Sequence, residues 1–342
     1  MREKTPVTSR ALLETAGGMR PCRICASLDY TPVYYIDEVE ISRCNRCDFI
    51  QIASVGSLSI LNAHYSSCGH DGPDLRSNFD KLKIIRAAGF RADYFMRHTG
   101  LTGGEVLEIG ASEGHFLDEL RGRGFNVTGV EPSRHGLKAV EKGLHVHRDM
   151  LENVALKDAH YDAICLFQVI EHFEDPLGVL RLLYSKLKAG GCLVVETPDI
   201  YSVGSKFEKT PWKLFNVEHI TYFSQKSLDE LLKAAGFKII ASRHCDYDGL
   251  RLPFAKMLKR VVVPLINPGF KGPLQKILAK EIDIRYRTSD HSRISAVGAR
   301  QGAGGKRLRD IKKMLAAPFD ILMSNIAYAL DRGSSVYSVA RK

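Results

Sequence analysis

The alternation of strands and helices along residues 105–199 constrains the fold more than any other feature of this sequence. Apolar runs at Val106–Ile109, Phe125–Val130, Tyr161–Phe167 and Cys192–Glu196 have the length of strands, and helical patterns lie between them. The third run is apolar almost throughout, as in a central parallel strand that helices cover on both faces. Alternation at this pitch indicates βαβ units. We therefore predict an α/β fold with a doubly wound, mostly parallel sheet.

A glycine turn follows the first of these strands and leads into a helix. Gly110 and Gly114 would let a ligand approach the backbone, and the N–H groups of the first helical turn would face that ligand. The two glycines could also serve only the turn and the packing of the helix. Ligands of doubly wound sheets bind at the C-terminal strand ends, where an acidic residue such as Glu131 can accept hydrogen bonds from both hydroxyls of a ribose. The residues expected at these ends are Gly110, Glu131, Asp149, Gln168 and Thr197.

Four cysteines form two C-x₂-C pairs near the N-terminus, Cys22 with Cys25 and Cys44 with Cys47. This spacing is typical of a zinc site, because each pair can form a knuckle that presents two thiolates to one tetrahedral ion. Apolar residues between the pairs can supply a β-hairpin. Four thiolates leave no open coordination position, so the expected Zn²⁺ is structural. Unligated cysteines or two disulfides are the alternatives.

Positive charge is concentrated in the last quarter of the chain. The formal net charge is +10, yet residues 251–342 hold 19 Lys and Arg against 6 Asp and Glu, which gives +13, and the first 250 residues hold 30 against 33, which gives −3. A basic region suits an anionic partner, such as a nucleotide-sugar, a lipid surface or a nucleic acid. A solvated surface without a partner fits equally well.

Four segments resemble, in the expected order, the class I S-adenosylmethionine-dependent methyltransferases: EVLEIGASEG, VEP, YDAICLFQVIEHFEDP and LKAGGCLVVETPD. The resemblance covers about residues 80–245. It implies a seven-stranded Rossmann-like sheet and S-adenosyl-L-methionine as cofactor. The family commonly has a middle glycine in the turn, where this chain has Ser112. A dinucleotide-binding alternative fits less well, because the third glycine of that fingerprint is missing. The implied cofactor contacts are Glu108, Gly110 and Gln168 on the methionine side, Ala111 in the turn, Gly114 packing the helix, Glu131 at the ribose, and Asp149 and Met150 at the adenine.

The segment N-x-E-H-x-x-Y-F-S at residues 216–224 resembles one found in zinc-ribbon methyltransferases of sugar and polysaccharide pathways. In the sugar C-methyltransferase branch, the resemblance places Glu218 and His219 in the active site, with His219 as the general base. His172, after the fourth strand, is a further candidate. Val217 replaces the first histidine of that branch's H-E-H triplet, so oxygen, carbon and nitrogen acceptors all stay open. A bracing role for these side chains is the alternative.

The C-terminal region is expected to close the sheet. Class I methyltransferases end in an antiparallel seventh strand, and Ser335–Arg341 has the pattern of that strand. Residues 246–334 would then be a basic helical insertion, which either caps the pocket or serves dimerisation. The predicted organisation is a loose N-terminus at 1–20, a zinc ribbon at 21–60, a linker and helix at 61–100, a core at 101–245 and 335–342, and the insertion at 246–334.

These observations predict a methyltransferase that acts on a small or glycan-type, anionic substrate. The alternatives are a nucleic-acid methyltransferase and a non-catalytic binding protein of the same fold, although nucleic acid is not the expected partner. Peripheral membrane contact through residues 251–330 and a homodimer are left open. The sequence has no apolar run of about 18 residues and no apolar leader, so the expected location is the cytoplasm, with the inner membrane face as an alternative.

Overall fold

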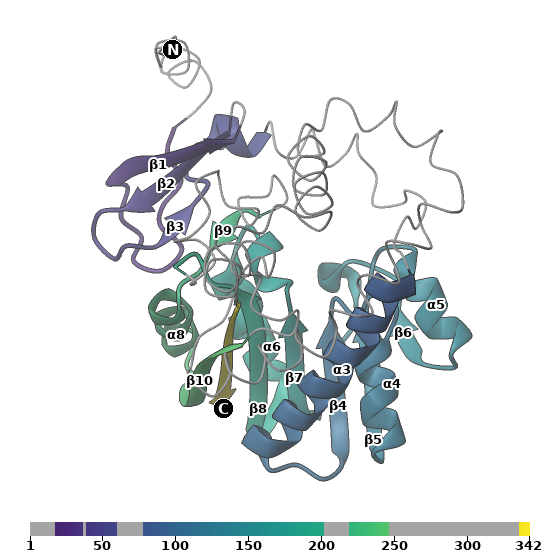
Figure 1. The fold of residues 1–342 in the computed structure, drawn as a ribbon. Coiled ribbons are helices and arrows are strands. Elements are labelled where there is room, and N and C mark those ends of the chain that lie inside the picture. The colour runs from purple at the N-terminus through teal and green to yellow at the C-terminus, as the bar shows by residue number, and fades with distance from the viewer. Residues whose placement is uncertain (1–17, 37–38, 60–77, 202–218, 246–334) are drawn as a thin grey trace, which may run out of the picture.

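The computed structural model describes residues 18–36, 39–59, 78–201, 219–245 and 335–342, drawn as coloured ribbon in Figure 1. The predicted linker, the basic insertion and Glu218 lie outside these residues. Within them, one seven-stranded sheet and one four-stranded sheet are formed. No helix among the described residues is both long enough and apolar enough to cross a bilayer.

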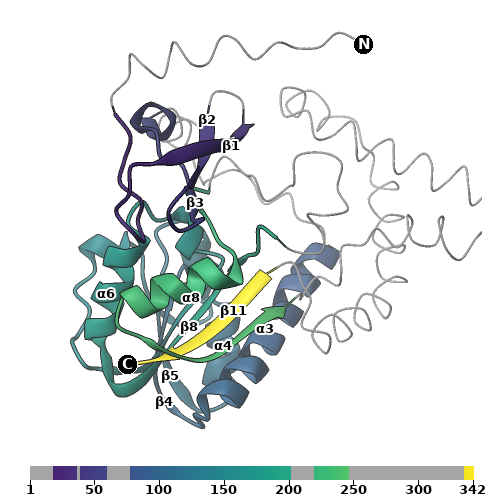
Figure 2. The ribbon, with the colours of Figure 1, turned by 90° about the vertical axis from the view of Figure 1, so that its left-hand side faces the viewer.

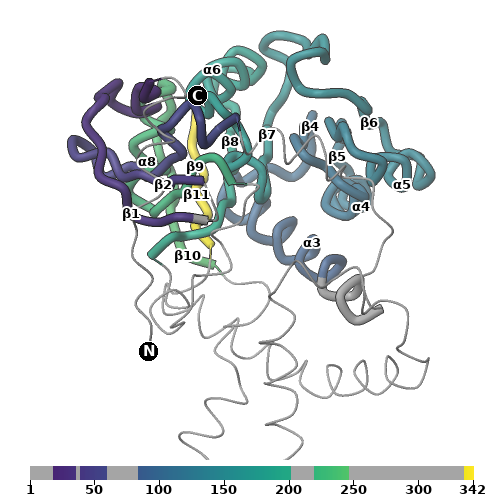
Figure 3. Tube along the Cα trace, turned by 90° about the horizontal axis from the view of Figure 1, so that it is seen from above, coloured from purple at the N-terminus to yellow at the C-terminus, as the bar shows by residue number. Residues whose placement is uncertain are grey.

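The large sheet has the predicted doubly wound arrangement, with strand order β10-β11-β8-β7-β4-β5-β6, which can be followed from above in Figure 3. The five strands from β8 to β6 in this order pair in parallel, and β11 pairs antiparallel with both β8 and β10. The predicted final strand is therefore confirmed. The strands are β4 (Gly104–Ile109), β5 (Phe125–Val130), β6 (His145–His147), β7 (Tyr161–Phe167), β8 (Leu187–Pro198), β10 (Lys238–Cys245) and β11 (Ser335–Arg341).

Helices cover both faces of this sheet. Alternate residues of β4 divide between the two resulting cores: Leu107 packs with α6 and α8, whereas Val106 packs with α3 and α4. Figure 2 shows α8 together with β11, in yellow. Ile85 of α3 is 45% exposed. The helices are α3 (Asn78–Thr99), α4 (His115–Gly122), α5 (His135–Glu141), α6 (Pro176–Lys186) and α8 (Gln225–Ala234), with 3-10 turns η1 (Leu151–Asn153) and η2 (Ile170–His172).

Local signals fix where two of these helices begin. Asp175 precedes α6 and accepts a hydrogen bond from the Gly178 backbone N–H at 3.2 Å, and Pro176 occupies the first helical position. Ser224 is the N-cap of α8 and forms a reciprocal capping box with Ser227. Both helices begin directly after segments that carry candidate site residues.

The small sheet has the order β1-β2-β3-β9 and combines two distant parts of the chain. The hairpin of β1 (Tyr30–Ile36) and β2 (Val39–Cys44) was predicted. The addition of β9 (Thr221–Tyr222) to β3 (Ile50–Gln51) was not. The four-cysteine region also shares a hydrophobic core with the large sheet, where the rings of Phe49 and Phe223 lie 5.4 Å apart. This region is therefore packed against the α/β domain and is joined to it by strand pairing.

Candidate active site

The turn between β4 and α4 requires glycine at two positions. Gly110 has φ of 74°, and a Cβ there would overlap the Val169 side chain. Gly114 has φ of 71°, and its Cβ would lie 2.5 Å from Leu144. Ser112 also adopts a left-handed conformation, with φ of 48°. Serine thus keeps the backbone shape at the position where the resembling family commonly has a middle glycine, at a cost of about 1–2 kcal/mol.

Glu131 connects the end of β5 to this turn. Its two carboxylate oxygens accept hydrogen bonds from the backbone N–H groups of Ser112, at 2.8 Å, and Ser133, at 2.9 Å. The side chain is largely buried. Each carboxylate oxygen has a second lone pair, so the fixed carboxylate can still accept hydrogen bonds from a pair of hydroxyls.

Glu108 of β4 is buried directly before the turn. Its Oε2 has no hydrogen-bond partner among the described residues. Burial raises the pKa of the Glu108 carboxyl well above its ordinary value, while Arg91 lowers the pKa and Glu131 raises it. A ligand ammonium would supply both the missing donor and the charge that an ionised carboxylate needs here. Together with Glu131, this carboxyl fits a ligand that carries an ammonium group and a ribose diol.

A second set of polar groups lies at the ends of β7 and β8. Gln168, with φ of 59°, donates from Nε2 to Glu196 Oε1 at 2.8 Å and to Ser335 Oγ at 3.2 Å. Arg91 of α3 binds both carboxylate oxygens of Glu196 at 2.8 Å. Sequence reasoning missed Arg91 and Glu196, because nothing in the sequence pairs a helix residue with a strand residue 105 positions away.

The two expected adenine contacts lie beyond β6, at the far edge of the parallel strands. Asp149 is exposed and accepts hydrogen bonds from Asn153 Nδ2 at 2.8 Å and from the Met150 N–H at 2.7 Å, which lower the pKa of its carboxyl. Met150 is 52% exposed, so its apolar side chain is accessible to a flat ring. The Glu131 N–H donates to the His147 carbonyl at 2.9 Å, so the end of β6 is connected through Glu131 to the glycine turn.

Glu171, His172 and His219 form a second cluster, at the end of η2 and before β9. The two imidazole rings meet edge to face, with centroids 5.0 Å apart. His219 is buried and His172 is half-buried. The structure therefore brings the predicted residues His172 and His219 together, whereas Glu218 lies outside the described residues.

Glu171 holds this cluster in place and was missed in the sequence. Its carbonyl accepts a hydrogen bond from the Ile220 N–H at 2.9 Å, and its Oε2 accepts one from Thr197 Oγ1 at 2.9 Å. Oε1 has no partner among the described residues, and burial raises the pKa of this carboxyl to about 8. The adjacent EH pair in the sequence was a usable signal, although it did not show that the glutamate is 2% exposed. A small hollow beside the cluster is lined by Glu171, His219 and Tyr222, among others.

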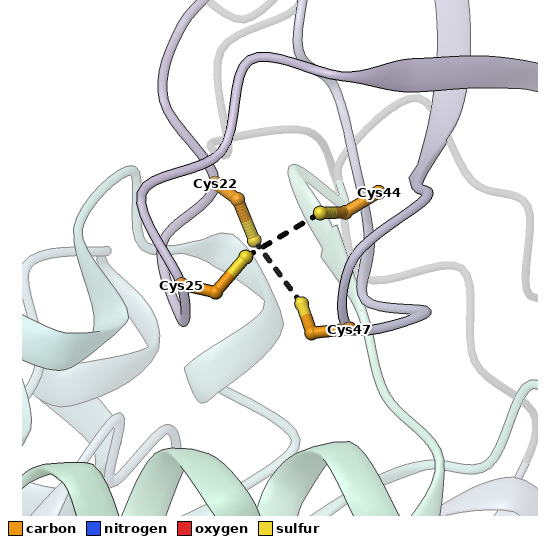
Figure 4. A group of neighbouring side chains, drawn as sticks. All are labelled: Cys22, Cys25, Cys44 and Cys47. Carbon is orange, nitrogen blue, oxygen red and sulfur yellow. Dashed lines mark hydrogen bonds between the residues drawn. The ribbon is translucent and has the colours of Figure 1, made fainter.

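The four N-terminal cysteines converge on one point, as Figure 4 shows. The sulfur atoms of Cys22 and Cys47 lie 3.5 Å apart, as do those of Cys25 and Cys44. All four sulfurs are within 4.8 Å of one another. This arrangement is compatible with a single tetrahedral ion.

Residues 86–242 match a family model described as a methyltransferase domain. An ubiquinone biosynthesis O-methyltransferase of Chromobacterium violaceum is 28% identical over 144 residues, which are 39% of this chain and 60% of that protein. C-methyltransferase NovU of Streptomyces niveus is 24% identical over 220 residues, 62% of this chain and 49% of that protein. A SAM-dependent methyltransferase structure from Archaeoglobus fulgidus covers 75% of this chain and 94% of its own, with 16% identity and a TM-score of 0.45. The chain therefore spans about three fifths of the length of the first curated relative and about half of the length of the second.

Proposed function

We propose, from the match of residues 86–242 to a methyltransferase-domain model and from the similarity to curated methyltransferases, that this chain transfers a methyl group from S-adenosyl-L-methionine to a small or glycan-type acceptor. The observation that carries the proposal is a pair of buried carboxyls, one just before the glycine turn and one hydrogen-bonded to it. Glu108 offers an oxygen that has no hydrogen-bond partner among the described residues, and Glu131 offers a carboxylate held by two backbone N–H groups. When bound, the cofactor supplies an electrophilic methyl group on a sulfonium.

The residues around the turn would hold this cofactor. Glu108 would bind its ammonium group and Glu131 its ribose hydroxyls. The backbone of Gly110 would allow close approach, and Gln168 would line the methionine side. Asp149 and Met150, at the end of β6, would contact the adenine.

The histidine cluster would serve the acceptor. An imidazole can accept a proton near neutral pH, so His219 is proposed as the general base that removes a proton from the acceptor atom. The adjacent ring of His172 restricts the orientation of His219. Glu218, next to His219 in the sequence, is proposed to orient the imidazole. Alignment of the acceptor with the methyl group would supply much of the remaining rate enhancement.

Two relatives support oxygen or carbon as the acceptor atom. The Chromobacterium violaceum relative is an O-methyltransferase, and its similarity covers 39% of this chain. The similarity to the Streptomyces niveus C-methyltransferase covers 62% of this chain, which is more than the segment 86–242 alone. This longer similarity makes carbon the first acceptor atom to test. The charge of residues 251–342 favours an anionic acceptor, such as a nucleotide-sugar.

The four cysteines are proposed to hold a structural Zn²⁺. Their convergence and the C-x₂-C spacing support this site, which would have no open position. Its role would be to fix the small sheet that carries β9.

Calorimetry with S-adenosylmethionine and S-adenosylhomocysteine tests the cofactor part of the proposal. We expect one site per chain, and Glu131→Gln should bind about tenfold or more weakly, since an amide NH₂ cannot accept a hydroxyl hydrogen. Glu141→Gln, on the exposed end of α5, is the matched control. Absence of binding would support the non-catalytic alternative.

Transfer of a labelled methyl group to a panel of nucleotide-sugars, polysaccharide precursors and RNA then tests the acceptor. Label on a sugar is the expected result. Transfer to RNA alone, with strong salt dependence, would instead support the nucleic-acid alternative.

A further inference from the structure

Glu171, His172 and His219 place one carboxylate and two imidazoles together, separately from the four cysteines. We propose that these three side chains form a second metal site, which takes a divalent ion of the Zn²⁺ class. This site goes beyond the proposed methyl transfer, which needs no metal ion at the acceptor.

The spacing of the three side chains permits a common ion. One ligand atom from each residue lies within 4.8 Å of the other two. An ion with bonds of about 2.0–2.1 Å holds tetrahedral ligands about 3.4 Å apart, so the widest pair would close by up to about 1.4 Å. His172 is half-buried, whereas Glu171 and His219 are buried, so we expect most of this movement from the His172 side chain. Glu171 and His219 would need smaller movements if His172 moves toward them.

One oxygen of Glu171, which has no partner in the part of the chain that the structure describes, points to a ligand rather than to a purely structural contact. Glu171 is 2% exposed, and its Oε1 accepts no hydrogen bond among the described residues. A buried oxygen without a partner costs free energy, which a bound cation would offset. Oε2 is meanwhile fixed by the Thr197 hydroxyl at 2.9 Å, as the outer partners of metal-bound carboxylates commonly are. Edge-to-face packing of the two imidazoles alone would leave Oε1 unsatisfied.

The donor set selects the class of ion. Two imidazole nitrogens and one carboxylate oxygen suit Zn²⁺ and its neighbours, whereas Mg²⁺ and Ca²⁺ prefer oxygen ligands alone. Three protein ligands leave one coordination position open. The hollow beside Glu171 and His219 has room at that position for a ligand about the size of one water molecule.

Ion binding would compete with the proposed role of His219. An imidazole nitrogen that binds an ion has no lone pair left to accept a proton. An ion at this site would therefore block the proposed base, and excess Zn²⁺ would inhibit methyl transfer. The metal-free cluster is the form in which His219 can act on an acceptor.

A comparison of Zn²⁺ binding by the unaltered chain and by its variants tests the site without any methyl acceptor. The full-length chain is stripped of loosely held metal, titrated with Zn²⁺ in a calorimeter, and analysed for metal per chain by mass spectrometry. We expect the unaltered chain to take up one more Zn²⁺ than Glu171→Gln or His172→Ala, or to bind that ion about 10- to 100-fold more tightly. His145→Ala, an exposed histidine of β6, is the matched control and should retain the uptake of the unaltered chain.

Equal uptake and affinity in the unaltered chain and both variants would overturn the proposal. Thermal unfolding followed by circular dichroism shows whether each variant is folded. If Glu171→Gln unfolds, the half-buried His172→Ala decides the result. Binding of S-adenosylhomocysteine at the glycine turn is measured separately, so failure of the metal site and failure of the proposed methyltransferase function give different outcomes.

Discussion

The backbone N–H of Ile220 donates to the carbonyl of Glu171 at 2.9 Å, and through this hydrogen bond two segments of the candidate active site are held together. The carbonyl of Ile220 in turn accepts a hydrogen bond from the Ile52 N–H at 2.9 Å. The residue after His219 thus connects the η2 turn to the region of the four cysteines. Order in that region and the position of His219 are therefore physically coupled.

Disruption of the cysteine site should impair transfer more than cofactor binding. In Cys47→Ser, loss of a proposed zinc ligand should loosen β3, which pairs with β9 next to His219. We expect transfer to fall about tenfold or more while the affinity for S-adenosylhomocysteine changes less than about threefold, since the glycine turn lies on other elements. Metal analysis, calorimetry and a transfer assay measure the three quantities. Full transfer by a variant that has lost the metal would contradict the coupling.

Gly110→Ala should destabilise the fold by about 2–4 kcal/mol. The substitution adds a Cβ at a positive φ and against the Val169 side chain, so conformational strain and overpacking combine. Urea unfolding measures the change. Gly122→Ala in α4 is the matched control, because no atom of the described residues lies within 4 Å of its added Cβ, and it should be neutral or slightly stabilising. Similar losses in both variants would contradict the account of the turn.

Cofactor binding should release a proton from Glu108. The raised pKa keeps this carboxyl protonated at pH values where an ordinary glutamate is ionised, and an ammonium beside it favours the ionised form. The affinity for S-adenosylhomocysteine should therefore rise with pH until the raised pKa is passed. The slope is at most about tenfold per pH unit. Calorimetry in buffers of different ionisation enthalpy measures the released proton.

Glu108→Gln supplies the control for this proton release, because its side chain cannot titrate. Binding by this variant should be weaker and should release no proton from this position. Equal proton release by the variant and the unaltered chain would assign the proton to another group.

His219→Ala should reduce methyl transfer by about 10²–10⁴-fold, the usual contribution of a general base. Cofactor affinity should stay within about threefold, because His219 lies at the acceptor cluster and not at the glycine turn. His145→Ala, away from the cluster, should transfer at the normal rate. A loss that appears only in KM for the acceptor would indicate that His219 binds the acceptor without removing its proton.

Local patterns explain why much of the large sheet could be predicted. Phe125–Val130 and Tyr161–Phe167 form strands with the predicted bounds, because each is a short run with strand-like residues whose ends are marked by local turns. The pairing of β3 with β9 was not predictable, since both strands have two residues and lie about 170 positions apart. The contact of Arg91 with Glu196 depends on the same long-range packing. The depth at which Glu171 is buried likewise follows from how η2 meets β9, which no local pattern encodes.

The position of β11 has a consequence for the order of assembly during synthesis. This strand lies between β8 and β10, yet both of those neighbours precede it in the chain, separated from it by up to about 140 residues. The gap in the sheet cannot be filled until residues 335–341 have left the ribosome. Until then the facing edges of β8 and β10 have unpaired backbone groups, which are prone to join other chains. We expect nascent chains to need protection from aggregation until the last strand inserts.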